Sequence, residues 1–255
     1  MLIDMHVHTS RYSACGKSTP EEMLKRAEQV GLNALVFTEH HMIWPRHELA
    51  VLRAAFPRIL IFSGVEIETM EGEDLLVYGV QDDFPCSRYL PATDVINLAR
   101  QQGGYTTLAH PLRYRDTSEA VLDAAPDGIE VMSIHVLNYA RRRIDHLAAR
   151  YHLLPMAASD AHHTSALGYY AITLQEPAST LQAILSGLRS TRYRLFSDAE
   201  RIRAGNNLAM QSKPEVQKRL EVGDDDGAIA RQVSGYTAHM VHALRNNLDF
   251  LHPLS

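Results

Sequence analysis

A chain of 255 residues that is 45% hydrophobic and 22% charged has the composition of an ordinary soluble globular protein, with one large α/β domain or two small ones. The net charge of −5 gives no overall basic field, which argues against long nucleic acid as a partner. The two cysteines, Cys15 and Cys86, make no disulfide framework, and no stretch approaches the roughly 20 apolar residues of a membrane span. Because Met1 also runs straight into an apolar strand without a leader, we expect a cytoplasmic protein with no membrane segment.

Short apolar runs alternate with amphipathic segments along the first 200 residues. The predicted strands cover residues 2–8, 33–40, 58–69, 74–80, 105–111, 127–133, 154–163, 168–174 and 192–196. The predicted helices cover residues 18–31, 46–56, 92–103, 118–125, 138–152 and 179–188. In the first helix, Thr19 is suited to the N-cap, Pro20 to the first helical position and Glu22 to a capping box.

This alternation predicts βαβ units and a mainly parallel sheet. About seven strand–helix repeats within 200 residues favour one barrel over two separate domains. We expect residues 1–199 to form this α/β barrel and residues 200–255 to form a helical appendage packed on the barrel or on a partner. Within the appendage, residues 213–227 are charged and turn-rich, and residues 228–251 predict one helix, which is a candidate surface for a homo-oligomer.

The first strand carries polar residues at every second position. Asp4, His6 and His8 therefore share one face of the strand, because side chains in a strand alternate between its two sides. Taken alone, this pattern is typical of a half-exposed strand with a polar face toward solvent.

The ends of the other predicted strands favour a metal cluster instead. In parallel α/β folds the active site forms where the strands end, and here nearly every strand delivers a potential ligand at that point. These residues are Glu39, His40, His41, Glu66, Glu68, His110, Glu130, His135, Asp160, His162 and His163. So many coincidences are hard to explain as solvated loops, so we interpret the polar face of the first strand as part of a metal site.

The segments DMHVH, TEHH, GVEIE, AHP, GIEV and SDAH resemble, in this order and spacing, the motifs of the PHP (polymerase and histidinol phosphatase) family, over roughly residues 1–196. The resemblance implies a distorted (β/α)7 barrel that binds two or three divalent ions at the strand ends and hydrolyses phosphoesters. It also implies roles for individual residues. His6 and His8 would hold one ion with Asp160, Glu66 would bridge, His110 would hold a second ion, and His40 and His162 would hold the next. Asp4 would orient a histidine.

Three positions depart from the family pattern. The loop after His8 often carries a further ligand in the family, whereas here Ser13 or Cys15 would have to replace it, or that ion site is weak. Position 39 is Glu where the family usually has Asp. Members of the family often have a further ligand beyond the strand that corresponds to GIEV. Here His135 either takes that position or does not, and the sequence leaves both alternatives open.

The ligand types predict the chemistry. Mixed imidazole and carboxylate ligands suit Zn²⁺, Mn²⁺ or Fe²⁺, and two such ions can activate a water and clamp the oxygens of a phosphoester. We expect Asp160, His162 and Glu66 to be catalytic, with Arg113 as the leading cation for the substrate phosphate beside Arg11 and Arg115.

The most direct interpretation is a phosphoesterase for a small phosphorylated metabolite or nucleotide. An exonuclease-type phosphodiesterase and a non-catalytic metal-bound module remain open.

Two further expectations concern the edge of the site. Cys15 stands on a polar loop that we expect to be flexible, so Cys15→Ser should leave more activity than His40→Ala. His239 and His242 lie in the predicted terminal helix, and we expect them to be packing and surface residues and not ligands.

Overall fold

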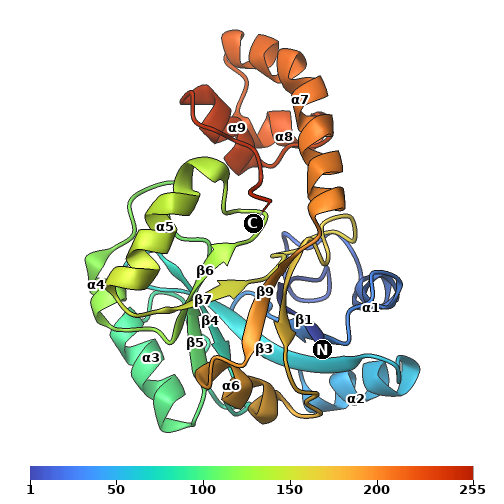
Figure 1. The fold of residues 1–255 in the computed structure, drawn as a ribbon, viewed down its shortest axis with the longest axis vertical. Helices are drawn as coiled ribbons and strands as arrows, with labels where there is room; N and C mark the ends of the chain where they lie inside the picture. Colours follow the sequence, from blue (N-terminus) through green and yellow to red (C-terminus); the bar gives the residue numbers. More distant parts are fainter. Residues whose placement is uncertain (255) are drawn as a thin grey trace.

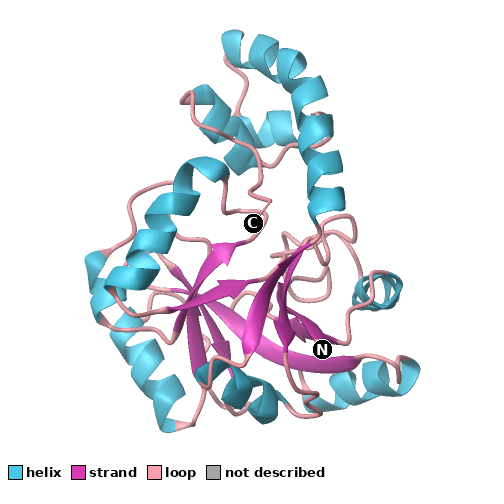
Figure 2. Ribbon diagram, viewed as in Figure 1, coloured by secondary structure: helices cyan, strands magenta, loops and turns pink. Residues whose placement is uncertain are grey.

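The computed structural model describes residues 1–254 as a barrel of strands covered by helices, with a group of helices standing beside it (Figures 1 and 2). The strands are β1 (Leu2–Val7), β2 (Ala34–Phe37), β3 (Leu60–Glu68), β4 (Asp74–Tyr78), β5 (Tyr105–Leu108), β6 (Gly128–Met132), β7 (Leu154–Ala157), β8 (Tyr170–Leu174) and β9 (Tyr193–Ser197). The helices are α1 (Pro20–Gln29), α2 (Arg46–Ala55), α3 (Ala92–Gln101), α4 (Glu119–Asp123), α5 (Asn138–Arg150), α6 (Leu181–Arg189), α7 (Ala199–Glu221), α8 (Asp226–Gln232) and α9 (Ala238–Arg245).

The strands form one sheet in the order β7-β6-β5-β4-β3-β2-β1-β8-β9. The sheet curls until β7 lies beside β8 and β9, where the Tyr193 hydroxyl donates a hydrogen bond to the Pro155 carbonyl at 2.8 Å. The predicted distorted α/β barrel is confirmed, as a nearly closed barrel-shaped sheet.

The prediction of a mainly parallel sheet is wrong. Neighbours β1–β2, β2–β3, β5–β6 and β6–β7 are parallel, but β3–β4, β4–β5, β1–β8 and β8–β9 are antiparallel. The short turn at residues 69–73 explains the first reversal, because only an antiparallel neighbour can be reached without a crossover connection.

Local signals in the sequence act as predicted at α1. The Thr19 side chain accepts a hydrogen bond from the Glu22 amide at 3.2 Å, while the Glu22 carboxylate accepts one from the Thr19 amide at 2.7 Å. Gly31 follows the helix with φ of +78°, a conformation that glycine adopts without strain. These contacts fix where the loop after β1 enters the first helix.

The appendage, predicted over residues 200–255 and described to residue 254, differs from its prediction in two places. The charged stretch at residues 213–227 is largely helical, because α7 continues through Pro214 to Glu221. The single helix predicted over residues 228–251 is wrong, since α8 and α9 are separate. Gly235 adopts a φ of +86° between them, and Thr237 then caps α9 by accepting a hydrogen bond from the Met240 amide.

The appendage has its own apolar core and returns to the barrel at the C-terminus (Figure 1). The Tyr170 hydroxyl on β8 donates to the Pro253 carbonyl at 2.6 Å, and the Asn138 amide at the start of α5 donates to the Leu251 carbonyl at 2.9 Å. Within residues 1–254, no helix has the length and apolar character needed to cross a membrane.

Candidate metal centre

The polar face of β1 is as buried as its apolar face. Asp4, His6 and His8 have no exposed surface, and neither do their apolar neighbours on the strand. The alternative of a polar face toward solvent is therefore wrong. A fully buried polar face needs partners, since burial of unpaired polar groups costs several kcal/mol each.

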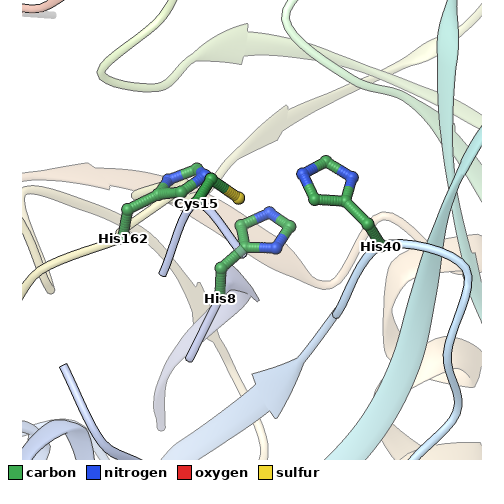
Figure 3. Close-up of side chains that lie close together, drawn as sticks. All are labelled: His8, Cys15, His40 and His162. Atoms are coloured by element: carbon green, nitrogen blue, oxygen red, sulfur yellow. The ribbon is translucent and has the colours of Figure 1, made fainter. Parts of the chain in front are cut away.

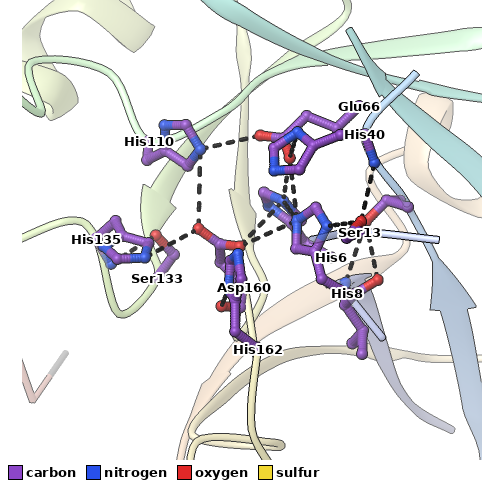
Figure 4. Close-up of polar contacts among 12 residues, drawn as sticks. His6, His8, Ser13, His40, Glu66, His110, Ser133, His135, Asp160 and His162 are labelled. Carbon is purple, nitrogen blue, oxygen red and sulfur yellow. Dashed lines mark hydrogen bonds and ion pairs between the residues drawn. The ribbon is translucent and has the colours of Figure 1, made fainter. Parts of the chain in front are cut away.

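The partners come from the ends of the other strands. All eight residues predicted as metal ligands lie close together at one end of the barrel (Figure 4). We call this set the strand-end cluster: His6, His8, His40, Glu66, His110, His135, Asp160 and His162. Four overlapping groups have candidate ligand atoms within 4.8 Å of one another: His6, Glu66 and His110; His6, His8 and Asp160; His135, Asp160 and His162; and His8, Cys15, His40 and His162.

Glu66 lies between two sets of imidazoles. One carboxylate oxygen, Oε1, is 3.0 Å from His110 Nε2. The other, Oε2, is 3.0 Å from His8 Nε2 and 3.2 Å from His40 Nδ1. The two oxygens thus face different histidines, which is the arrangement of a bridging carboxylate.

Asp160 spans the same cluster from the opposite wall. Its Oδ1 is 3.2 Å from His6 Nε2 and 3.3 Å from His8 Nε2, whereas its Oδ2 is 3.5 Å from His135 Nε2. Three buried oxygens, Glu66 Oε2 and both of Asp160, have no hydrogen-bond partner among residues 1–254. Buried carboxylate oxygens that meet only imidazole nitrogens, none of them in hydrogen-bond geometry, fit a divalent cation, because imidazole and carboxylate together make the donor set that transition metals prefer.

The electrostatic couplings in the cluster are strong. Burial raises the pKa of Asp160, but His6, His135 and His162 outweigh it and hold that pKa well below its usual range. Burial likewise lowers the pKa of His8, yet the carboxylates of Asp160 and Glu66 raise it to about 9. Each group therefore depends on opposite charge nearby, as expected where several charges are buried together.

Glu130 on β6 orients the first histidine. His6 Nδ1 donates to Glu130 Oε1 at 2.8 Å, which leaves the Nε2 lone pair facing the cluster, and Glu130 Oε2 accepts from the His110 amide at 2.8 Å. We predicted this role for Asp4, and that prediction is wrong. Asp4 accepts from the backbone amides of Ser159 at 2.9 Å, Gly168 at 3.2 Å and His6 at 3.4 Å, and not from the His6 ring, so it fixes the chain on either side of the Asp160 loop.

Ser13 performs the corresponding function for His8. Its hydroxyl donates to Glu39 Oε2 at 2.5 Å and accepts from His8 Nδ1 at 3.2 Å, so His8 also presents Nε2 to the cluster. Glu39 thus anchors the loop after β1 and lies outside the four ligand groups. Trp44 packs in the core and donates from Nε1 to Glu39 Oε1 at 3.1 Å.

Two members of the cluster adopt unusual backbone conformations. His110 has a φ of +26° and Asp160 a φ of +51°, in the left-handed region that residues with a Cβ rarely occupy. Such conformations cost on the order of 1–3 kcal/mol and persist where the surroundings impose them, often at functional sites. Here they turn the His110 and Asp160 side chains toward the cluster.

A pocket of about 350 Å³ opens beside His110, which is the member of the strand-end cluster that lines it. Arg113 lines it, and one guanidinium nitrogen lies 3.2 Å from His135 Nε2. Arg115 also lines the pocket, but its guanidinium donates to the carbonyls of Glu71 and Gly72. Arg11 pairs with Glu48 on the surface, 3.0 Å away, so of the three expected arginines Arg113 is the one that approaches the cluster.

Asp74 is a pocket residue that the sequence analysis missed. It begins β4, lies 3.9 Å from His110 Nε2 and lines the same pocket. Burial, together with the charge of Glu66, raises its pKa to about 6. Asp74 carried no signal in the sequence, because we expected ligands at the carboxyl ends of parallel strands and Asp74 lies at the start of a strand.

The appendage contributes a histidine near the cluster. His239 is fully buried, and its Nε2 is 2.9 Å from the hydroxyl of Tyr139. His239 belongs to none of the four ligand groups found within residues 1–254, and His242 is partly exposed beside Asp226. The structure thus places one of these histidines in packing and the other at the surface.

The sequence comparison bears on this geometry directly. The model of the PHP domain matches residues 4–173, two thirds of the chain and every member of the strand-end cluster. The chain belongs to the PHP family. No curated protein matched the chain in the corresponding search.

Solved structures share the fold at low sequence identity. PsfC from Pseudomonas syringae is 17% identical with a TM-score of 0.59, over 78% of this chain and 92% of PsfC. A two-domain protein from Bacteroides vulgatus containing a predicted PHP-like metal-dependent phosphoesterase is 18% identical with a TM-score of 0.62, over 78% of this chain and 65% of that one. The lesion-specific endonuclease PfuEndoQ from Pyrococcus furiosus is 16% identical with a TM-score of 0.57, over 76% of this chain and 57% of the endonuclease.

Proposed function

We propose that this protein is a metal-dependent phosphoesterase that hydrolyses a small phosphorylated metabolite or nucleotide. One observation carries the proposal: two buried carboxylates, Glu66 and Asp160, present oxygens without hydrogen-bond partners among residues 1–254 to six histidines at the strand ends of a PHP barrel. A protein without a metal ion would gain little by burying this set of charges.

The four ligand groups assign the residues that would hold ions, two or three per chain, of Zn²⁺, Mn²⁺ or Fe²⁺. Glu66 would serve ions on both of its sides, and Asp160 would do the same from the opposite wall. When bound, a pair of such ions lowers the pKa of a water and stabilises both the attacking and the leaving oxygen of a phosphoester.

The chain's own residues prepare this chemistry. Glu130 and Ser13 hold His6 and His8 in the tautomer that directs Nε2 into the cluster. Asp160, Glu66 and His162 would act through the ions that they hold. Catalysis needs its reacting groups held within narrow limits of geometry. The residues of the strand-end cluster follow strands, and Glu130 links two of them by accepting hydrogen bonds from His6 Nδ1 and the His110 amide.

Arg113 is the residue that we assign to the substrate phosphate. It lines the pocket beside His110 and has a buried Nε with no partner among residues 1–254. His135 Nε2 has one lone pair, so it can accept from Arg113 or hold an ion, but not both. An ion on His135 would therefore leave the Arg113 guanidinium free for a phosphate, which it binds with two parallel hydrogen bonds.

A phosphodiesterase acting on nucleic acid is the second candidate, because structures that share this fold include a lesion-specific endonuclease. The net charge of −5 argued against such a substrate, but that argument has no support from the structural comparisons. Charge near the pocket matters more than the total, and two arginines, Arg113 and Arg115, line it together with two carboxylates, Glu73 and Asp74.

The test is hydrolysis by the purified protein after reconstitution with Mn²⁺, Zn²⁺ or Fe²⁺. An aryl phosphate monoester, an aryl phosphodiester and a single-stranded oligonucleotide separate the candidates. We expect turnover of the monoester with an added transition metal and none of it after chelation. Preferential cleavage of the oligonucleotide would favour the second candidate, whereas no hydrolysis of any phosphoester would contradict the proposal.

The matched control is His146→Ala. His146 is an exposed histidine on α5 outside the strand-end cluster, so its loss should leave turnover unchanged. Equal losses in His146→Ala and in a cluster variant would show that the assay does not report on this site.

A further inference from the structure

Cys15 stands beside the strand-end cluster and has no function in the account given so far. Its sulfur and one ring nitrogen each of His8, His40 and His162 lie within 4.8 Å of one another. Figure 3 shows the Cys15 sulfur beside the three rings, which come from the ends of three different strands. The His8 ring stacks against those of His40 and His162, with centroids 4.6 and 4.4 Å apart, so all three rings share one corner of the site.

The loop that carries Cys15 is tightly constrained, contrary to the expectation of a flexible loop. The Ser10 amide donates to the Ser18 carbonyl at 2.9 Å and so closes the loop at its base, and the Gly16 amide donates to the Ser13 carbonyl at 3.0 Å. A Cβ at Gly16 would lie 2.3 Å from the Thr9 carbonyl, so only glycine fits directly after Cys15.

The same loop is bound to the cluster on both sides of Cys15. Before it, the Ser13 hydroxyl contacts His8 Nδ1 and accepts from the His40 amide, both at 3.2 Å. After it, the Lys17 amide donates to the His162 carbonyl at 2.7 Å. Every histidine of this corner is therefore linked to the segment that holds the sulfur.

The two substitutes in this loop differ in what their side chains contact. The Ser13 hydroxyl is occupied by Glu39, His8 and the His40 amide, so it supports the ligands from behind. The Cys15 sulfur instead lies beside the ring nitrogens of His8, His40 and His162. Buried carboxylate oxygens of Glu66 and Asp160 border the same corner and lack hydrogen-bond partners among residues 1–254, which independently points to a cation there.

We propose that Cys15 is a thiolate ligand and that, with His8, His40 and His162, it forms a site selective for a thiophilic divalent ion such as Zn²⁺ or Fe²⁺. This inference rests on the proposed metal-dependent function and assigns a different donor set to one of its ions. One sulfur and three imidazoles match the ligands of zinc and iron, whereas Mg²⁺ and Mn²⁺ prefer oxygen donors. When the ion binds, the Cys15 S–H bond is replaced by a metal–sulfur bond and the proton leaves to the buffer.

The test uses the full-length chain carrying Cys86→Ser, so that Cys15 is its only thiol. Titration with Co²⁺ should give a near-ultraviolet thiolate-to-cobalt charge-transfer band, and Zn²⁺ should remove the band by displacement. The band should be absent when Cys15→Ser is added, with about one fewer ion per chain by elemental analysis. We expect the Zn²⁺ affinity of this site to fall by more than about 10-fold, since even the loss of a residue behind a ligand costs 10–100-fold.

Two comparisons make the result specific. His40→Ala should lose the same ion as Cys15→Ser, so this assignment replaces the expectation from the sequence that Cys15→Ser leaves more activity than His40→Ala. His163→Ala, which changes an exposed histidine next to His162, should keep both the ion and the band. Unchanged thermal melting of the metal-free variants would show that they are folded.

The outcomes separate this inference from the proposed function. Bound metal and phosphoester hydrolysis without a charge-transfer band would overturn the assignment of Cys15 and leave the function intact. A band without hydrolysis of any phosphoester would support Cys15 as a ligand and contradict the function. A chain that binds no transition metal would contradict both.

Discussion

Buried histidines occur in two regions of this molecule, in opposite electrostatic surroundings. In the strand-end cluster, neighbouring carboxylates outweigh burial at His8 and raise its pKa to about 9, whereas burial prevails at His162 and lowers its pKa to about 4. In the appendage, burial lowers the pKa of His239 to about 3, together with the charge of Arg113, and burial alone lowers that of His252 to about 4. Each histidine of the cluster has a carboxylate of Glu66 or Asp160 within 3.5 Å, whereas His239 and His252 have none among residues 1–254, stay neutral and pack.

The difference shows what distinguishes a candidate ligand from a packing histidine. Both His6 and His239 are fully buried, so burial alone does not separate them. His6 has Glu130 behind it and Asp160 in front, whereas His239 has the Tyr139 hydroxyl at 2.9 Å. Carboxylates on both sides of an imidazole are the feature that points to a metal.

The largest expected effect comes from Asp160, the carboxylate that belongs to two of the four ligand groups. We expect Asp160→Asn to lower phosphoester turnover by about 1,000-fold or more, roughly 4 kcal/mol of transition-state stabilisation, because a neutral amide holds divalent ions weakly. Steady-state rates and elemental analysis on the same preparation check this. Full turnover with a full metal complement in Asp160→Asn would remove the cluster from the mechanism.

Acid should weaken the appendage through its neutral histidines. The folded-state pKa of His252, about 4, lies below the unfolded value of about 6.5, so the unfolded chain binds more protons between these pH values. Its contribution to stability is therefore present above pH 6.5 and is lost as the pH falls toward 4, by about 2 kcal/mol at pH 5. Urea unfolding at pH 7.5 and pH 5 measures this.

The matched variant for the pH experiment is His252→Gln, which has no titrating group at that position. It should lose less stability than the wild type between the two pH values, whatever its stability at pH 7.5. Identical losses in the two proteins would mean that His252 is not the group that responds to acid.

A smaller effect is expected from the support behind a ligand. Glu130→Gln keeps the shape of the side chain but weakens its hydrogen bond to His6 Nδ1, so metal affinity or turnover should fall by about 10–100-fold. Metal titrations of Glu130→Gln beside the wild type provide the measurement. A loss as large as that of Asp160→Asn would indicate that Glu130 itself binds an ion.

The smallest effect should come from the appendage side of the pocket. His239→Phe removes the partner of the Tyr139 hydroxyl, which also lies 3.2 Å from the Arg113 carbonyl. Because only the support of Arg113 changes, we expect kcat/KM to fall by less than about 10-fold, close to the roughly 1 kcal/mol of one hydrogen bond. The change should lie in KM more than in kcat. A large fall in kcat with unchanged KM would place His239 in the chemistry.

The barrel was predictable from the sequence because its signals are local. Apolar runs marked the strands, Thr19 and Glu22 marked the first helix, and ligands at strand ends marked the cluster. The reversal at β4 could have been predicted from the short turn at residues 69–73, whereas the direction of β8 depends on its pairing with β1, a contact distant in sequence. The break at Gly235 was missed because apolar residues both precede and follow it, so the helical pattern in the sequence continues through a residue that adopts a turn conformation.

Within the site, residue types were predictable and pairings were not. Asp4 and Glu130 are both buried acids, on β1 and on β6, and these two strands are not paired with each other. Only the curling of the sheet into a barrel brings Glu130 to His6 Nδ1. Ser13 and Cys15 lie two residues apart on one loop, and the sequence did not distinguish their positions. The Ser13 hydroxyl contacts His8 Nδ1, whereas the Cys15 sulfur lies beside ring nitrogens of His8, His40 and His162. Homo-oligomerisation through the C-terminal helices, the cytoplasmic location and the division at residue 199 stay predictions.

The most direct test of the central claim is anomalous X-ray diffraction from crystals reconstituted with Mn²⁺ or Zn²⁺. We predict at least two peaks within coordination distance of Glu66 and Asp160 oxygens, with two of them about 3.5–4 Å apart, as a pair acting on one phosphoester requires. A well-ordered cluster without an anomalous peak at either carboxylate, at saturating metal, would contradict the claim that these buried charges form a metal centre.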